Sequence, residues 1–158
     1  MQNFTVFTHL ETFPVIARLA KQALQIPEDG LLVLREIDAE TQTFKDWKSL
    51  QGLLSRARKA IKSPEDLGAV FIERLKAGVV APWTKDLPND WHTFRIPLVT
   101  NPGATEYCRN ETVHMPVGSL WWTNTEDWAS SANWGTEPRY HLVFELGKPG
   151  VPTDGDPV

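Results

Sequence analysis

The chain has 158 residues, a net charge of −4, and a composition of 41% hydrophobic and 23% charged residues, which is typical of a folded globular protein and argues against extensive disorder. Its uncharged apolar runs are far shorter than the ~20 residues that span a bilayer, and Gln2 and Asn3 stand where a signal peptide carries basic residues, so we expect neither a membrane span nor secretion. General nucleic-acid binding is disfavoured because no Lys/Arg cluster is present, and the single cysteine, Cys108, favours the cytoplasm.

Two stretches near the N-terminus carry apolar residues at helical spacing. They predict helices over residues 13–25 and 44–62. The short aliphatic run 31–37 between them predicts a strand. Each predicted helix has a single apolar stripe, so we expect both helices to cover one face of a sheet.

The pattern changes near Ser63 and Pro64, after which short runs alternate with Gly, Pro and Asn. Eight candidate strands follow at residues 69–75, 79–83, 93–100, 105–108, 112–115, 119–123, 129–133 and 139–146. Their regular spacing, and their number, predict a jelly roll in an α+β protein. We expect one domain over residues 1–146, divided into a helical buttress (1–63) and a jelly-roll core (64–146), with a flexible tail at 147–158.

Three basic side chains fall on one face of the predicted strands. Arg139 and His141 are two residues apart, and Arg95 holds a comparable position on an earlier strand. A buried arginine must be paired or must bind an anion. Two interpretations stay open, namely internal pairing with Glu73, Glu106 or Glu145, and a pocket for a carboxylate or phosphate. The four histidines show no spacing typical of a metal site, and no nucleophile motif is present.

Several motifs in the second half occur together in order. They are LGAVFIERLKAG (67–78), FRIPL (94–98), Asn110-Glu111, MPVGSLWW (115–122), Asn133, and RYHLV (139–143). Together they resemble the aspartyl/asparaginyl β-hydroxylase family, most closely its short forms in bacteriophages and bacteria, over roughly residues 67–146. The resemblance implies a double-stranded β-helix, the cupin-like jelly roll, in a dioxygenase that uses iron and 2-oxoglutarate to hydroxylate its substrate.

The resemblance implies that the arginines that bind 2-oxoglutarate are kept in this sequence and that the iron ligands are not. The family's arginine that grips 2-oxoglutarate matches Arg139, and an earlier arginine matches Arg95. The first iron histidine falls on Trp83, its optional carboxylate on Lys85, and the second histidine on Ala129, four residues before Asn133. Tryptophan and alanine cannot hold iron.

From this we expect no catalytic residue, no metal and no cofactor, with iron unlikely to bind and 2-oxoglutarate or a similar anion as the one possible ligand. Four side chains, Arg95, Arg139, His141 and Lys85, are expected to make the interior electropositive and to bind the anion. The expected pocket walls are Trp83, Trp122, Ala129 and Asn133.

The leading hypothesis is a β-hydroxylase-like protein that has lost iron-dependent activity, a pseudoenzyme. It would bind a small carboxylate or phosphate, or an unidentified protein, in the cytoplasm of a host cell if it is phage-encoded. One alternative is an active dioxygenase with unusual metal ligands such as His92, His114, Glu126 or Asp127. Another is a structural or inhibitory protein whose pocket is filled by Trp83.

Overall fold

The computed structural model describes residues 2–10, 14–26, 31–35 and 47–148. The elements run in the order β1-α1-β2-α2 and then β3 to β9. The helices are α1 (Pro14–Ala23) and α2 (Trp47–Ile61). The strands are β1 (Phe4–His9), β2 (Leu31–Arg35), β3 (Leu67–Leu75), β4 (Trp91–Val99), β5 (Ala104–Cys108), β6 (Glu111–Val113), β7 (Ser119–Thr123), β8 (Ala129–Asn133) and β9 (Arg139–Gly147).

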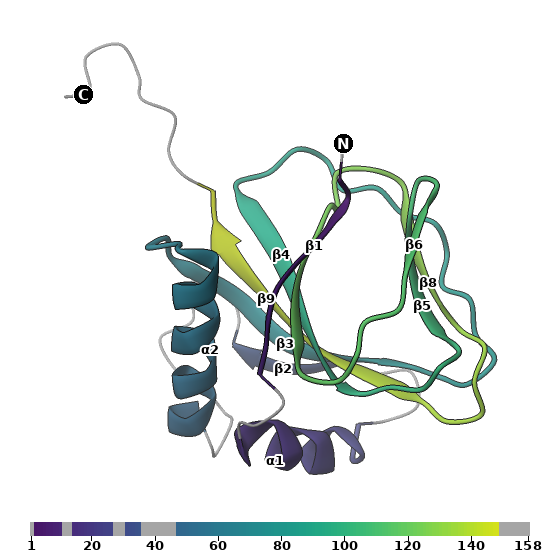
Figure 1. The fold of residues 1–158 in the computed structure, drawn as a ribbon, viewed down its shortest axis with the longest axis horizontal. Coiled ribbons are helices and arrows are strands. Elements are labelled where there is room, and N and C mark those ends of the chain that lie inside the picture. The colour runs from purple at the N-terminus through teal and green to yellow at the C-terminus, as the bar shows by residue number, and fades with distance from the viewer. Residues whose placement is uncertain (1, 11–13, 27–30, 36–46, 149–158) are drawn as a thin grey trace.

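The strands form two antiparallel sheets that face each other. The larger sheet has six strands in the order β1-β7-β4-β9-β3-β2, and the smaller has three in the order β6-β5-β8. Figure 1 shows α1 and α2 on the outer side of the larger sheet, away from the smaller one. This arrangement is a double-stranded β-helix with two buttressing helices, so the predicted α+β fold is confirmed.

The two faces of the larger sheet carry different side chains, because successive residues of a strand point to opposite faces. In β9, Leu142 and Phe144 belong to the hydrophobic core that also contains the helices. Their neighbours Val143 and Glu145 line a pocket between the sheets. The helices therefore cover the apolar face, and the polar face looks into the barrel.

The two helices are anchored by fully buried leucines. Leu19 of α1 and Leu50 and Leu53 of α2 have no exposed surface, and they pack in the same core as the outer face of the larger sheet. Helix α2 ends where Lys62 adopts a left-handed conformation (φ 60°) and the backbone N–H of Ser63 donates to the carbonyl of Arg58 at 3.2 Å. Both predicted helices are present, although residues 13 and 44–46 lie outside the described part. Neither described helix has the length and apolarity needed to cross a membrane.

The strand count differs from the prediction in two places. Strand β1, which pairs with β7 at an edge of the larger sheet, was not expected. The predicted strand 79–83 makes only one isolated bridge in the described structure, Val80 with Ala132, and a second bridge, Thr84 with Ala129, follows directly after it. Its ladder is incomplete because Pro82 has no N–H to donate. Of the predicted tail, Gly147 is the last residue of β9, and residues 149–158 lie outside the described part.

Candidate functional site between the two sheets

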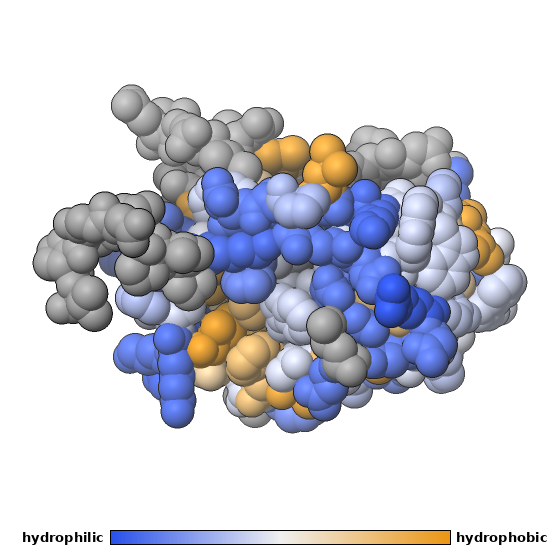
Figure 2. All heavy atoms as spheres, turned by 90° about the horizontal axis from the view of Figure 1, so that it is seen from above, coloured by the Kyte–Doolittle hydropathy of each residue, from blue (hydrophilic) through white to orange (hydrophobic). Residues whose placement is uncertain are grey.

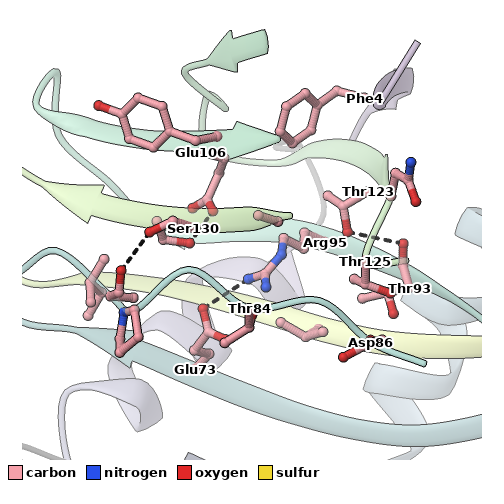
Figure 3. Close-up of a pocket in the computed structure, with 18 of the residues that line it drawn as sticks. Phe4, Glu73, Thr84, Asp86, Thr93, Arg95, Glu106, Thr123, Thr125 and Ser130 are labelled. Atoms are coloured by element: carbon pink, nitrogen blue, oxygen red, sulfur yellow. Dashed lines mark hydrogen bonds and ion pairs between the residues drawn. The ribbon is translucent and has the colours of Figure 1, made fainter. Parts of the chain in front are cut away.

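A pocket of about 520 Å³ lies between the inner faces of the two sheets. We call it the intersheet pocket. One wall comes from β3, β4 and β9 of the larger sheet, and the opposite wall comes from β5, β8 and residues 81–86. Figure 3 shows the guanidinium of Arg95 turned toward Glu73, with Glu106 reaching into the same space from the opposite strand. The acidic and basic side chains of the wall are Glu73, Arg74, Asp86, Arg95, Glu106 and Glu145.

The floor of the pocket is an ion-pair network around a fully buried arginine. Arg139 has no exposed side-chain surface, and its two terminal nitrogens lie 2.9 Å from Glu73 Oε1 and 2.7 Å from Glu106 Oε1. Arg95 Nη1 also lies 2.9 Å from Glu73 Oε1. The second oxygen of Glu106 accepts a hydrogen bond from Ser131. Of the two interpretations that the sequence left open, the geometry therefore shows internal pairing with Glu73 and Glu106, and not with Glu145.

The opposite charges of Glu73 and its arginine partners favour the ionised form of the groups in this network. Burial alone would raise the pKa of Glu73, but the positive charges of Arg95 and Arg139 outweigh that effect and lower the pKa to about 2. Burial would lower the pKa of Arg95, but the Glu73 charge raises it instead. Glu73 and Arg95 are thus both ionised throughout the physiological pH range.

His141 belongs to the same buried cluster but is not a cation. Burial lowers its pKa well below the ordinary value, and the charges of Arg139 and Arg95 lower it further. Its Nδ1 lies 3.5 Å from Arg95 Nη1 and 3.8 Å from Glu106 Oε1. The predicted basic trio therefore contributes two positive charges, and the two nearby carboxylates balance both.

The expectation of an electropositive interior is wrong. Four carboxylates line the intersheet pocket, whereas only two guanidinium groups do. Lys85 is not among the lining residues. Its charge acts on the partly buried carboxylate of Asp127, whose pKa is lowered by a backbone hydrogen bond from Trp128, then by Arg109, and then by Lys85. Three of these carboxylates, Glu73, Glu106 and Glu145, were named from the sequence as possible partners of the arginines, but Asp86 was not expected in the pocket.

The segment 81–86 contributes Ala81, Pro82, Thr84 and Asp86 to the pocket lining, so the alternation of lining and non-lining residues begins at Pro82. Thr84 and Asp86 line the pocket, although both are exposed to solvent. Trp83 does not line it; Trp83 is 48% exposed, and its ring centroid lies 6.1 Å from that of Tyr107. Thr84 pairs with Ala129 of β8, and each backbone N–H donates to the other's carbonyl at 2.9 Å. Ala129 also lines the pocket.

The family resemblance had implied that Trp83 and Lys85 face the pocket. The pairing of Thr84 with Ala129 shifts these inward positions by one residue. The inward positions are Thr84 and Asp86, not Trp83 and Lys85, because neighbouring residues of an extended segment face opposite sides. The position of the second histidine stays at Ala129. Trp83 therefore does not fill the pocket, and a carboxylate, Asp86, stands where the resemblance had placed Lys85.

The remaining predicted wall residues, Trp122 and Asn133, make hydrogen bonds within the fold instead of lining the pocket. Trp122 is half-buried, and its Nε1 donates to His92 at 3.3 Å. Asn133 is fully buried; its Nδ2 donates to the carbonyls of Leu75 and Glu137 at 3.1 and 2.8 Å, and its Oδ1 accepts from Asn101 at 3.1 Å. Neither residue lines the intersheet pocket.

The unusual ligands of the alternative hypothesis are not brought together in this pocket. Glu126 pairs with Lys148, and Asp127 lies 2.6 Å from Arg109. The His114 Nδ1 lies 2.8 Å from the carbonyl of Ala104, and His92 contacts Trp122. None of the four is among the residues that line the pocket.

Comparisons with known proteins identify the fold. No protein-family model matches the sequence, and no curated protein is significantly similar to it. Solved structures are similar at low identity. A viral collagen prolyl hydroxylase from Paramecium bursaria Chlorella virus-1 is 10% identical, with a TM-score of 0.67 over 94% of this chain and 91% of that chain. A prolyl-4-hydroxylase from Pseudomonas putida is 12% identical, with a TM-score of 0.65 over 94% of each chain.

These structures correct the expectation that no cofactor is involved. The viral prolyl hydroxylase was also solved as a complex with 2-oxoglutarate, at 10% identity and a TM-score of 0.66 over 93% of this chain and 97% of that chain. HygX from Streptomyces hygroscopicus was solved with iron bound, at 12% identity and a TM-score of 0.64 over 92% of this chain and 82% of that chain. The fold is thus shared with structures that hold 2-oxoglutarate or iron, so the expectation that excluded both groups is withdrawn. The narrower aspartyl/asparaginyl hydroxylase family is not among these matches.

The donors on the pocket wall do not match the usual iron site. A two-histidine, one-carboxylate set leaves positions open for co-substrate and oxygen. Here Asp86 supplies a carboxylate, but Thr84 and Ala129 supply no nitrogen. Among the described residues there is no group of three or more His, Cys, Asp or Glu side chains that could hold a metal ion.

Proposed function

We propose that the protein binds a small polar molecule in the intersheet pocket, and that this binding, rather than iron-dependent hydroxylation, is its function. The proposal rests on a pocket of about 520 Å³ in an oxygenase fold. The two paired residues that line this pocket where the family has its iron histidines are Thr84 and Ala129, and neither can bind iron through a nitrogen. Pockets of roughly 300–1,000 Å³ are typical of small-molecule sites.

The chemistry of the wall suits a ligand with several polar groups. Thr84, Thr93 and Thr125 line the pocket beside the carboxylates, and each has a hydroxyl group. Phe4 and Phe71 add apolar surface. A few polar groups set among apolar side chains can orient a ligand and select it.

A small carboxylate or phosphate group remains part of the proposal, with Arg95 as its contact. The Arg95 side chain is 15% exposed and lines the pocket, whereas Arg139 is fully buried behind it. An anion at Arg95 has to share the guanidinium with Glu73. The cytoplasmic location, the phage origin and the aspartyl/asparaginyl hydroxylase relationship are likewise proposals from the sequence.

The test is calorimetric titration of the purified protein with 2-oxoglutarate, succinate, citrate, a nucleotide, and neutral and amino sugars, each with and without ferrous iron. Thr84→Phe should fill the pocket and weaken binding at least tenfold. Trp83→Phe, one residue away on the outer side, is the matched control and should leave binding unchanged. Equal effects of the two substitutions would contradict the pocket assignment.

Turnover is measured in the same preparations. Succinate formation from 2-oxoglutarate that depends on added ferrous iron would overturn the proposed loss of hydroxylation. We expect no succinate above the level of a protein-free control, because Thr84 and Ala129 cannot replace two histidines.

A further inference from the structure

The smaller sheet has one face toward the intersheet pocket and one face toward solvent. Glu106 of β5 reaches into the pocket (Figure 3), so the side chain of its neighbour Tyr107, which borders the same pocket, points the other way. Figure 1 shows α1 and α2 against the larger sheet, so neither described helix covers the outer face of the smaller one. The segment 81–86 bridges to β8 and widens this face by one more chain.

Three tryptophans and one tyrosine gather on the outer face of the smaller sheet. Trp83, Trp128 and Trp134 are 48%, 55% and 62% exposed. The ring centroid of Trp83 lies 6.1 Å from that of Tyr107, and Trp134 Nε1 donates to the Tyr107 hydroxyl at 3.3 Å. We call these four side chains the aromatic row. Contiguous exposed apolar surface of this kind marks interaction sites.

The aromatic row follows the length of β8. Trp128 directly precedes this strand and Trp134 directly follows it. Their Cα atoms are six residues apart in an extended chain, which is about 20 Å at ~3.3 Å per residue. The even spacing places both side chains on the same face. Tyr107, which pairs with Ser130 in the middle of β8, lies between them. A row of this length can contact several units of a linear polymer.

Positive and negative side chains are mixed beside the aromatic row and do not form a basic surface. Arg109, directly after β5, is 67% exposed, and its Nε lies 2.6 Å from Asp127 Oδ2. The charge of Lys85 acts on the same carboxylate. Glu137 adds a second carboxylate in the turn after Trp134. These four charges balance, and the chain as a whole carries −4. The face therefore offers little attraction to a polyanion, whereas an uncharged ligand matches it.

Exposed tryptophan and tyrosine rings suit the flat faces of sugar rings. The face of an aromatic ring carries partial negative charge, and it attracts the weakly positive C–H groups on the face of a sugar. Sugar hydroxyls both donate and accept hydrogen bonds, so they can use a guanidinium and a carboxylate that lie side by side, as Arg109 and Asp127 do. Rigid aromatic side chains also lose little conformational entropy on binding.

We infer that the aromatic row binds a linear, uncharged oligosaccharide, whose sugar rings stack on the tryptophans and whose hydroxyl groups bond with the charged side chains beside them. This site faces solvent on the opposite side of the smaller sheet from the intersheet pocket. The inference therefore does not depend on the proposed function.

Oligosaccharides of different length provide the test. Cellohexaose, maltohexaose, laminarihexaose and N-acetylchitohexaose are titrated into the protein, and binding is followed by tryptophan fluorescence and calorimetry. We expect at least one hexamer to bind, and to bind at least tenfold more tightly than its own disaccharide, because the row contacts several sugar units. A tenfold increase in salt concentration should leave this affinity unchanged, because the ligand has no charge to screen.

The variants Trp83→Ala and Trp134→Ala should each weaken binding of that hexamer about tenfold or more, since each removes a stacking surface. Trp134→Phe keeps an aromatic ring and should retain most of the affinity. The control Leu24→Ala removes an exposed apolar side chain from α1 and should have no effect. Thr84→Phe fills the intersheet pocket and should also leave hexamer binding unchanged. Far-UV circular dichroism verifies that each variant is folded.

Three results would overturn the inference, namely no binding of any hexamer, binding that survives both substitutions to alanine, and binding that is lost in Thr84→Phe. Tighter binding of an oligo-dT strand or of decaproline at the same tryptophans would also overturn it, because the occupant would then be a nucleic acid or a peptide. A nucleic acid would show itself by an affinity that falls as salt is added.

Discussion

At the scale of single residues, Arg139 is the side chain whose removal should cost most. Its charge is fully buried and is met by two carboxylates, so Arg139→Ala leaves Glu73 and Glu106 without their shared cation. Breaking a buried pair in this way costs roughly 3–5 kcal/mol of unfolding free energy. Urea unfolding followed by tryptophan fluorescence measures the change.

The control for this substitution is another arginine that also makes an ion pair. Arg109 lies 2.6 Å from Asp127, but its side chain is 67% exposed. An exposed pair contributes about 0–1 kcal/mol, so Arg109→Ala should change stability little. A similar loss in both variants would show that burial is not what makes Arg139 important.

Glu73 should make stability depend on pH in the acidic range. Its pKa is about 2 in the folded protein, below the ordinary value of 4.5. A lowered pKa stabilises the fold at pH values above the unfolded pKa, and this contribution is lost as the pH falls from about 4.5 toward 2. The shift corresponds to about 3 kcal/mol. Urea unfolding at several pH values should show this decline in wild type, and a flatter decline in Glu73→Gln.

The sequence predicted part of this network and left part undecided. A buried arginine needs a partner, so Glu73, Glu106 and Glu145 could all be named in advance. The choice among them depends on cross-strand register: β9 pairs with β3 so that Glu73 lies opposite His141 and next to Arg139, while β5 supplies Glu106 from the facing sheet. No local pattern in the sequence contains that register.

At the scale of elements, the segment 81–86 shows why the candidate site was misplaced by one residue. A slip of one position moves every side chain of an extended segment to the other face. The segment has no continuous ladder of paired residues, because isolated bridges at Val80 and Thr84 lie on either side of Pro82. No regular alternation of side chains was therefore available to set its register. The longer strands and the helices, by contrast, have enough periodic residues to be predicted from the sequence.

The corrected register can be tested by building a metal site. Thr84→His with Ala129→His would join Asp86 in a two-histidine, one-carboxylate set on the pocket wall. We expect this double variant to bind cobalt(II) at least a hundredfold more tightly than wild type, as measured by visible absorption. Trp83→His with Ala129→His is the matched control; it places one histidine on the outer face and should gain little. Equal gains in the two variants would favour the original register.

The turns at the ends of β5 and β8 are held by two closely spaced glycines. A Cβ on Gly103 would lie 2.4 Å from the backbone nitrogen of Gly135 and 2.7 Å from the carbonyl carbon of Trp134. Both neighbours are backbone atoms and cannot rotate away. Gly103→Ala should therefore destabilise the fold by about 1–3 kcal/mol in thermal unfolding.

Gly52 provides the opposite case. It lies inside α2, and a Cβ there would meet no atom within 4 Å. Gly52→Ala should stabilise the protein by up to about 1 kcal/mol, because alanine favours the helix. Destabilisation of both variants to the same extent would indicate that steric contact at Gly103 is not the cause.

At the scale of the whole molecule, one hydrophobic core joins the helices to the larger sheet. It contains Leu19 of α1, Leu53 of α2, Ile72 of β3 and Phe144 of β9, among others. Figure 2 shows the surface seen from above as mostly hydrophilic, with apolar side chains in separate groups. We propose that residues 1–146 unfold as one cooperative unit. Far-UV circular dichroism and tryptophan fluorescence should give the same urea midpoint, and two separate midpoints would contradict this.

Strand β1 has a consequence for the order in which the protein folds. Phe4 pairs with Thr123, so β1 leaves the ribosome long before its partner strand β7 has been synthesised. Pairing between residues so far apart in the chain slows folding. The nascent chain therefore carries β1 without its partner strand while the residues between β1 and β7 are synthesised, a period in which chaperones could shield β1 from pairing with other chains.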